Sequence, residues 1–287
     1  MLLNAFANVI HAGKRIGLTR GWFPIARGLR RVIPEARFFP KFFPSVGDVY
    51  LDLAETMCFP LFNSEVPQPE TAIFEKFIQS DDVVFDIGAN FGWTTAVAAR
   101  SARHVYAFEP ASASLRLLRA TAANRPNVTI YPIALGDTDD HIDCYVSSRG
   151  DMSTIGSVNQ FAPTVRSVER VAICRLDSLV QSDRLPLPDF LSCDVEGYEL
   201  KMFAGARETL KQAQPVVFFE FAPGYGEDHG YDLLTLLNTL NSCLPSGTQF
   251  YRVRQNGDLQ ACFAETKDSS NNYLAIPPGR TPAPPIN

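Results

Sequence analysis

A short glycine-containing segment carries the most informative polar residues of the chain. Asp86, Gly88, Asn90 and Gly92 alternate along Asp-Ile-Gly-Ala-Asn-Phe-Gly, which follows the apolar run 83–87. Glycine lets the backbone turn tightly and approach a ligand closely, and open α/β sheets bind ligands beyond the carboxyl ends of their strands. The segment therefore predicts a cofactor-binding loop that opens a helix, and a purely structural turn is the alternative.

The same segment discriminates between cofactors. A dinucleotide fingerprint that begins at Gly88 would need glycine where the chain has Asn90 and Trp93. The carboxylate of Asp86 would repel a pyrophosphate but suits a ligand with an ammonium and a sulfonium group. Glu109, 23 residues further on, ends the next apolar run, where a carboxylate accepts hydrogen bonds from ribose hydroxyls. The pattern favours S-adenosylmethionine and disfavours a dehydrogenase.

A second group of carboxylates follows a later apolar run. Asp194 and Glu196 lie in Asp-Val-Glu-Gly-Tyr-Glu, directly after the predicted strand 190–194. Alternation along an extended chain would put both side chains on one side. Such a pair could take a proton from a hydroxyl, or hold a divalent cation that lowers the pKa of that hydroxyl. In the alternative interpretation, Asp194 caps the following helix and Glu196 is solvated.

Two further residues are candidates for a catalytic base. Glu220 ends the next predicted strand, at the same edge of the sheet. His229 lies in a glycine-rich loop, and its ordinary pKa near neutrality would suit a base, although a plain loop residue is the stronger interpretation.

The elements that must position these residues follow a βα rhythm from residue 82 onward, which predicts an α/β fold with a mostly parallel sheet. Strands are expected at 83–87, 104–108, 128–131, 190–194, 216–220, 250–254 and 273–276, the last two as an antiparallel edge hairpin. Helices are expected at 93–101, after a cap at Ser112, at 198–212 and around 233–240. A hairpin insertion at about 138–175 interrupts the rhythm, either as a flexible loop near the site or as a surface decoration.

The two ends differ from this core, which we place at 68–278. Residues 1–67 are predicted to form a basic, partly helical extension, and the proline-rich segment 279–287 a disordered tail. Residues 1–47 hold eight Lys or Arg and one acid, which leaves a formal charge of −12 for the rest of a chain whose total is −5. The acidic remainder argues against nucleic acid as a partner. The basic segment either packs on the domain or contacts an anionic membrane, carrier or partner protein.

Cysteine use and hydropathy set expectations for the compartment. The six cysteines include no C-x-x-C pair, so we expect reduced thiols and a cytoplasmic protein, peripheral to the membrane if the basic segment binds lipid. The charges of the N-terminus follow its apolar stretch, the wrong order for a secretory signal. No uncharged run is apolar enough to predict a transmembrane helix.

Taken together, these motifs resemble those of the FkbM-type methyltransferases. The resemblance extends over about residues 68–278, and the matching residues occur in the same order: 84–92, 106–110, 175–179, 194–199 with Gly205, and 272–274. It implies a Rossmann-like class I methyltransferase sheet with a reversed final strand, S-adenosylmethionine as methyl donor, and O-methylation of sugars or natural products.

The leading hypothesis is therefore an O-methyltransferase that acts on a sugar, glycolipid or other small-molecule hydroxyl. Asp86, Gly88, Asn90, Gly92 and Glu109 would hold the donor. The candidate carboxylates would lie near the acceptor and remove its proton while the site aligns the reacting groups. N-methylation of an amine or a protein, and a non-catalytic module that binds S-adenosylmethionine, remain the alternatives.

Overall fold

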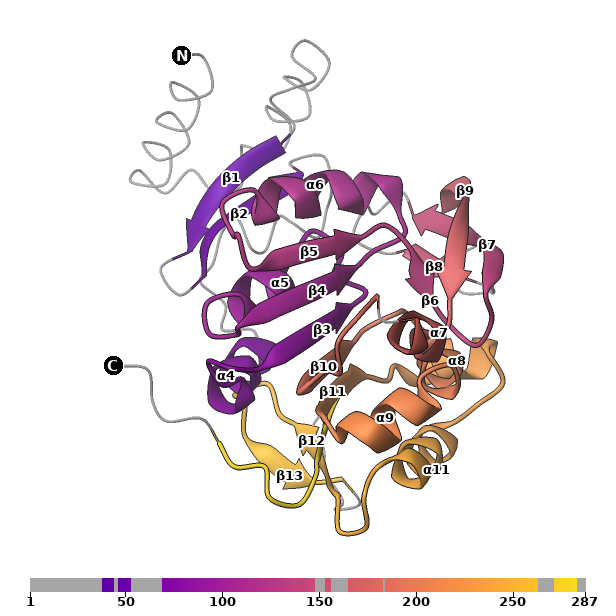
Figure 1. Ribbon diagram of the computed structural model, residues 1–287. Helices are drawn as coiled ribbons and strands as arrows, with labels where there is room; N and C mark the ends of the chain where they lie inside the picture. Colours follow the sequence, from indigo (N-terminus) through magenta and orange to yellow (C-terminus); the bar gives the residue numbers. More distant parts are fainter. Residues whose placement is uncertain are drawn as a thin grey trace.

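A computed structural model describes residues 38–43, 46–52, 69–147, 153–155, 165–182, 184–262 and 271–282. A twisted sheet crosses the middle of the molecule, with helices on both of its faces and a smaller sheet beyond one edge of strand ends (Figure 1).

The central sheet, within these residues, has eight strands in the order β13-β12-β14-β11-β10-β3-β4-β5. Their bounds are β3 (Val83–Ile87), β4 (His104–Phe108), β5 (Val128–Tyr131), β10 (Phe190–Cys193), β11 (Val216–Glu220), β12 (Gln249–Val253), β13 (Leu259–Ala261) and β14 (Asn272–Ile276). The five strands β5, β4, β3, β10 and β11 pair in parallel, so their carboxyl ends meet at one edge. The predicted α/β class and its mostly parallel sheet are confirmed.

The last strand of the chain runs against this parallel set. β14 pairs antiparallel with both β11 and β12, and it lies between them. The sequence predicted the antiparallel pair at the edge of the sheet, but the edge is formed instead by β12 with the short strand β13. Because β14 carries three consecutive buried residues, Tyr273, Leu274 and Ala275, an interior position satisfies its apolar side chains on both faces.

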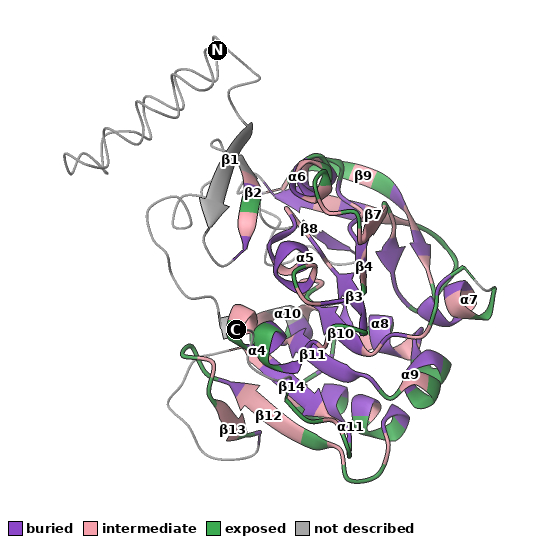
Figure 2. Cartoon of the chain, turned by 60° about the vertical axis from the view of Figure 1, so that its left-hand side comes forward, coloured by how far each residue is buried: buried purple, intermediate pink, exposed green. Residues whose placement is uncertain are grey.

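Two hydrophobic cores lie on opposite faces of the sheet, where Figure 2 shows the buried residues concentrated. Alternation along β3 divides its side chains: Phe85 joins one core and Val84 the other. The first core holds α7 (Leu176–Gln181), α8 (Glu199–Ala204), α9 (Arg207–Ala213) and α11 (Leu233–Cys243), whereas α4 (Pro69–Phe77) and α5 (Trp93–Ala98) pack in the second. Each fully buried large apolar side chain contributes about 1.5–3 kcal/mol, so both faces are strongly stabilised.

Two helix predictions were wrong. The helix expected at 198–212 is split into α8 and α9 at Gly205, where a Cβ atom would lie 1.8 Å from the carbonyl oxygen of Gly136. This close contact between segments far apart in sequence has no local signal. Ser112 does not cap α6 (Ser112–Ala122), whose N-cap is Ala111; the Ser112 hydroxyl instead donates to Glu169, at 2.7 Å.

The segment that interrupts the βα rhythm forms a second, four-stranded sheet in the order β6-β9-β7-β8. It consists of β6 (Ala134–Leu135), β7 (Asp140–Ser147), β8 (Ser153–Ile155) and β9 (Val165–Cys174). The long strands β7 and β9 pair antiparallel, as a hairpin insertion requires. Figure 1 shows this sheet beyond the tips of β4 and β5, which places it beside the ligand-binding edge.

Little of the predicted N-terminal extension is described. Its described residues form an antiparallel hairpin of β1 (Phe38–Phe43) and β2 (Gly47–Asp52), and β2 packs against α6. At the other end, the Arg280 guanidinium contacts the Asp82 carboxylate, so the first residues of the predicted tail are attached to the start of β3. The remainder of both segments lies outside the described residues.

Where the structure describes cysteines, at Cys144, Cys174, Cys193, Cys243 and Cys262, they are free thiols. No helix in the described part of the chain is long and apolar enough to cross a membrane.

Candidate active site

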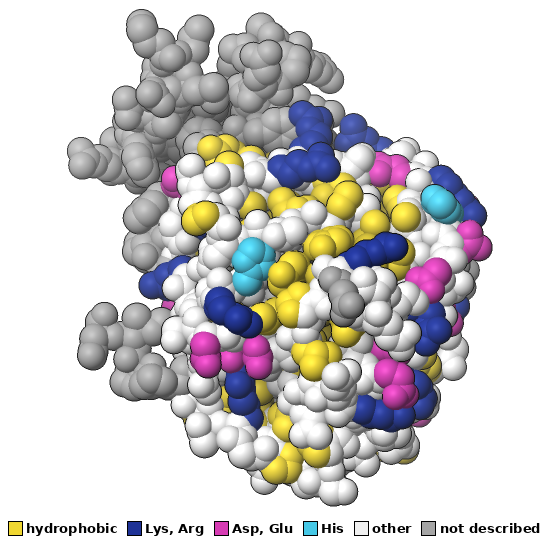
Figure 3. All heavy atoms as spheres, viewed as in Figure 1, with side chains coloured by type: hydrophobic (Ala, Val, Ile, Leu, Met, Phe, Trp, Pro, Cys, Tyr) yellow, Lys and Arg dark blue, Asp and Glu magenta, His cyan; other side chains and the backbone are white. Residues whose placement is uncertain are grey.

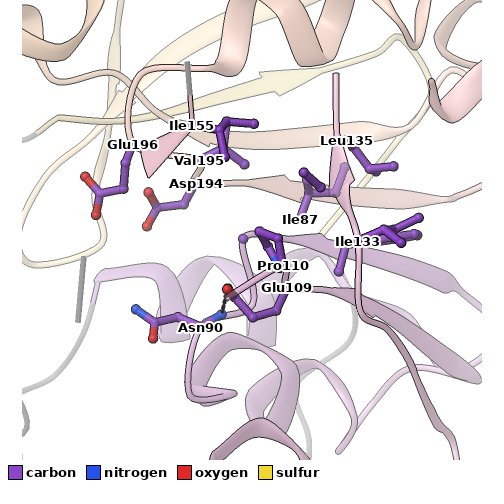
Figure 4. Close-up of a pocket in the computed structure, with 13 residues that line it drawn as sticks. Ile87, Asn90, Glu109, Pro110, Ile133, Leu135, Ile155, Asp194, Val195 and Glu196 are labelled. Atoms are coloured by element: carbon purple, nitrogen blue, oxygen red, sulfur yellow. Dashed lines mark hydrogen bonds between the residues drawn. The ribbon is translucent and has the colours of Figure 1, made fainter. Parts of the chain in front are cut away.

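A pocket opens at the carboxyl ends of β3, β4 and β10 (Figure 4). Its walls come from the end of β3 and the loop after it, the end of β4, the loop after β10, Ile133 before β6, and three residues of the small sheet in β6 and β8. The lining residues are Ile87, Gly88, Asn90, Phe108, Glu109, Pro110, Ile133, Ala134, Leu135, Ile155, Asp194, Val195 and Glu196. Gly88, Asn90, Glu109, Asp194 and Glu196 are the candidate residues that the fold brings together here.

The two glycines of the loop after β3 allow its backbone to turn and to pack closely against neighbouring segments. Gly88 has φ 83° and Gly92 has φ 92°, in the left-handed region that favours glycine. A Cβ atom on Gly88 would lie 1.7 Å from the backbone oxygen of Asp194, and one on Gly92 would lie 2.8 Å from the Leu118 side chain. The loop is therefore packed against β10 and α6. The positive φ values agree with the predicted tight turn, and the packing of both glycines against other segments is a further reason for their presence that the sequence did not indicate.

Asn90 and Glu109 connect the loop to the end of β4. The backbone N–H of Asn90, at φ 50°, donates to one Glu109 carboxylate oxygen at 2.9 Å, and the N–H of Ala111 donates to the other at 2.8 Å. Burial raises the pKa of Glu109 to about 7. A carboxylate offers about four acceptor sites, so two remain for a ligand. These contacts hold Glu109 at the pocket wall without exhausting its capacity to accept hydrogen bonds.

Asp86 lies behind the loop and does not line the pocket. One carboxylate oxygen accepts from the hydroxyls of Thr94 and Thr95, at 3.0 and 2.5 Å, at the start of α5. Burial raises its pKa to about 6, an effect that the two hydroxyls oppose. Asp86 therefore holds the loop against the helix that follows, a contact that the sequence pattern did not indicate.

Asp194 and Glu196 stand on the opposite wall, and Figure 4 shows both carboxylates pointing to the same side of the pocket. The reason differs from the predicted strand alternation, because β10 ends at Cys193 and Glu196 has φ 53°. The backbone N–H of Asp194 donates to Ile87, at 2.9 Å, and the carbonyl of Glu196 accepts from Thr154 in the small sheet, at 3.1 Å. Asp194 does not cap α8, whose N-cap is Tyr198.

A buried pair that the sequence analysis missed supports this loop. One Glu199 carboxylate oxygen accepts from the N–H groups of Val195 and Gly197, both at 3.2 Å, and the other accepts from the Tyr231 hydroxyl at 2.7 Å. Burial raises the pKa of Glu199, and these hydrogen bonds oppose the rise. The second glutamate of Asp-Val-Glu-Gly-Tyr-Glu was visible in the sequence, but Tyr231 is contributed by a distant segment with no pattern of its own.

Glu220 lies at the end of β11, which neighbours β10, and its side chain shares a hydrogen bond with Asp194. Solvent reaches Asp194 through the pocket, yet the enclosing protein and the negative charge of Glu220 raise the pKa of Asp194 well above its usual range. The pKa of Glu220 rises to about 7, chiefly through burial and then through the charge of Glu196. Burial and mutual repulsion therefore disfavour ionisation of both carboxyl groups at once, and Asp194 donates the proton in their shared hydrogen bond to Glu220.

His229 is not among the residues that line the pocket. Its ring contacts the ring of Tyr198, with centroids 5.6 Å apart, just after α10 (Pro223–Asp228). Burial and the nearby Lys201 lower the pKa of His229. Since its charged neighbours are Lys201 and Asp228, it stands apart from the carboxylates of the pocket, which weakens its candidacy as a base.

Among the residues that the structure describes, no three His, Cys, Asp or Glu side chains are placed to hold one metal ion.

A second hollow lies at the other end of β3 and β4, lined by Val83, Arg103, His104, Tyr106, Arg184, Leu185 and Pro186. Figure 3 shows hydrophobic side chains between groups of Lys and Arg on the face turned to the viewer in Figure 1. None of the candidate residues lines this hollow.

Comparisons with known proteins identify similar methyltransferases. Hexuronic acid methyltransferase AglP of Haloferax volcanii is 27% identical over 143 residues, which are 48% of this chain and 56% of AglP. The match thus spans about half the length of that relative.

Among solved structures, the FkbM methyltransferase of Methylobacillus flagellatus has 19% identity and a TM-score of 0.47, over 76% of this chain and 50% of its own. SMU.1697c of Streptococcus mutans, a putative methyltransferase solved with S-adenosylhomocysteine, has 10% identity and a TM-score of 0.41, over 72% and 94% of the two chains. Residues 86–250, more than half of the chain, match the methyltransferase FkbM domain, and the chain therefore belongs to the FkbM methyltransferase family.

Proposed function

We propose that the protein transfers a methyl group from S-adenosylmethionine to a hydroxyl oxygen of a saccharide-like acceptor. The observation that carries this proposal is the composition of the two pocket walls. Asn90 and Glu109 face a ligand from one side, and Asp194 and Glu196 face it from the other, at the edge where the carboxyl ends of the parallel strands meet. Ligand binding at this edge is the general rule for open α/β sheets.

The donor wall suits an adenosine with a positively charged tail. Glu109 keeps two acceptor sites for ribose hydroxyls, and the apolar side chains of Ile133 and Leu135 suit the flat adenine ring. Asp86 contributes through the loop that it holds against α5. When bound, S-adenosylmethionine supplies a methyl group on a sulfonium, which needs no metal to be electrophilic.

The acceptor wall suits a hydroxyl that must lose a proton as it reacts. Glu220 does not line the pocket, but its pKa of about 7 and its hydrogen bond with Asp194 suit it to receive a proton through Asp194 near neutral pH. Asp194, whose proton is held in the hydrogen bond to Glu220, can accept a hydrogen bond from an acceptor hydroxyl through its other oxygen and orient it. Glu196 faces the same space and is the second candidate for the base. Alignment of the acceptor oxygen with the methyl group accounts for the rest of the catalysis.

The nature of the acceptor rests on chemistry and on one relative. A pocket lined by several carboxyl groups recognises the many hydroxyls of a sugar through hydrogen bonds. AglP, the matched relative, is named for a hexuronic acid. A sugar, glycolipid or sugar-like natural product is therefore the acceptor class that we propose.

The test is a transfer assay with isotope-labelled S-adenosylmethionine and a panel of glycans, glycolipids, small alcohols and amines, with mass detection of the products. The proposal predicts label on a saccharide hydroxyl. Label exclusively on amines would establish N-methylation instead. Binding of the donor without transfer to any member of an extensive panel would favour a non-catalytic module, and tighter binding of NAD than of S-adenosylmethionine would reject the donor.

We further propose that the basic segment 1–47 brings the enzyme to an anionic surface such as a membrane. Eight Lys or Arg against one acid support this, since each basic residue near an anionic membrane contributes roughly 1 kcal/mol. The test is co-sedimentation of the full chain with phosphatidylserine vesicles at low salt. A variant with Arg27, Arg30 and Arg31 changed to Gln should sediment less, and equal sedimentation of the two proteins would reject the proposal.

A further inference from the structure

The hairpin β1–β2 is attached to the rest of the molecule through α6. Val46 and Val49 of the hairpin are buried in the same core as Trp93, the first residue of α5. The Arg125 guanidinium, just after α6, donates to the backbone oxygens of Val46 and Asp48, at 3.0 Å each. This side chain also donates to the carbonyl of Thr121, so it joins the hairpin to the last turn of the helix.

The hydroxyl of Thr121 continues this connection to the pocket. It accepts the backbone N–H of Tyr50 in β2, at 3.0 Å, and donates to the carbonyl of Phe91 in the loop after β3, at 2.9 Å. Thr121 is buried, and its side chain also lies against the position where Gly92 would carry a Cβ atom. A single hydroxyl therefore bridges the hairpin and the loop.

The loop needs such support because of its backbone conformation. Asn90 and Gly92, on either side of Phe91, both have positive φ, which a residue other than glycine adopts at a cost. Conformations of this kind persist where surrounding contacts fix them. Ser114 of α6 donates to the Asn90 side chain, at 3.2 Å, so α6 holds the loop at two points. Only one of these points, Thr121, is shared with the hairpin.

We infer that the hairpin β1–β2 supports the donor-binding loop through Arg125 and Thr121, so that these two positioning residues set the affinity for S-adenosylmethionine from outside the pocket. The inference rests on the proposed donor. It assigns a role in donor binding to a hairpin that lies outside the residues 86–250 matched by the family. Neither Thr121 nor Arg125 lines the pocket, so an effect of either one must pass through the loop.

The test is titration calorimetry of the full chain with S-adenosylmethionine, well below the unfolding temperature of every variant. Thr121→Val, which removes the bridging hydroxyl, should raise Kd about three- to tenfold, as expected for the loss of one net hydrogen bond. Arg125 hydrogen-bonds to the hairpin and not to the loop, so Arg125→Gln should raise Kd about threefold. Thr121→Ser keeps the hydroxyl and should restore Kd to within about twofold of the wild type.

The matched control is Thr239→Val on α11, whose hydroxyl donates to the carbonyl of Thr235, at 2.9 Å, away from the pocket. It should leave Kd unchanged. If Thr121→Val or Arg125→Gln lowers the unfolding temperature but binds the donor with wild-type affinity, the contacts are merely structural and the inference is overturned. Absence of binding by the wild type would overturn the proposed donor together with the inference, so the two failures are distinguishable.

Discussion

We predict that the proposed contact between Glu109 and the donor makes donor binding depend on pH. Burial raises its pKa to about 7, and its ionised form is the one that accepts hydrogen bonds from ribose hydroxyls. Binding should therefore weaken as the pH falls through 7, because a growing fraction of the protein must first lose a proton. With that pKa, about nine-tenths of Glu109 is ionised at pH 8 and about one-tenth at pH 6, so Kd should rise roughly tenfold.

The assay is calorimetric titration with S-adenosylmethionine at pH 6, 7 and 8 and constant ionic strength. Glu109→Gln keeps the shape of the side chain and removes its charge, so it should bind weakly at every pH and lose most of the pH dependence. Glu220→Gln is the matched control, since Glu220 also has a pKa of about 7 but stands on the acceptor side. A wild-type Kd constant within twofold between pH 6 and 8, or a full tenfold change that persists in Glu109→Gln, would refute the reasoning.

Four further substitutions separate the roles of the remaining residues. Glu196→Gln and Asp194→Asn should lower kcat by about 10²- to 10⁴-fold if either group activates the acceptor, with donor Kd unchanged by calorimetry. Tyr231→Phe removes the hydroxyl that donates to Glu199, and kcat should fall while donor Kd stays within about twofold of the wild type. Asp177→Ala removes the acceptor for two backbone N–H groups and one hydroxyl at the start of α9, and should lower the free energy of unfolding by about 1–3 kcal/mol in urea titrations.

Each of these expectations has a contradicting result. Turnover within about twofold of wild type in both Glu196→Gln and Asp194→Asn would reject Asp194 and Glu196 as the groups that activate the acceptor, and would leave Glu220 as the candidate base. Tyr231→Phe with unchanged kcat would show that Glu199 holds its loop without the hydroxyl. An unchanged urea midpoint and slope in Asp177→Ala would show that water replaces the lost acceptor.

Local patterns in the sequence were sufficient to predict where the parallel strands β3, β4 and β5 begin and end. The strands at 83–87, 104–108 and 128–131 were predicted with the bounds that β3, β4 and β5 have in the structure. Each is a short apolar run that ends at a turn or polar residue, and such a signal needs no knowledge of the neighbours. The order of the sheet and the place of β14 inside it depend on contacts between distant segments, and no local pattern encodes them.

The site, like the fold, has residues that a local sequence pattern indicates and contacts that no local pattern indicates. Gly88, Asn90, Glu109, Asp194 and Glu196 were found from residue type and position at strand ends, and all of them line one pocket. The close packing of the two glycines could not be predicted, because the atoms that exclude a Cβ atom there belong to Asp194 and α6, which are distant in the sequence.

The supporting contacts escaped the sequence analysis altogether. Tyr231 reaches Glu199 across 32 residues, and Tyr50 reaches Thr121 across 71. Contacts of this kind are set by how the elements pack, so a single sequence carries no signal for them.

The most direct test of the central claim is a crystal structure of the protein with S-adenosylhomocysteine. The account predicts the ribose hydroxyls within hydrogen-bonding distance of the Glu109 carboxylate, the adenine beside Ile133, and the sulfur facing Asp194 and Glu196. A ligand bound elsewhere, or bound in this pocket with its ribose away from Glu109 and its sulfur away from the two carboxylates, would contradict it.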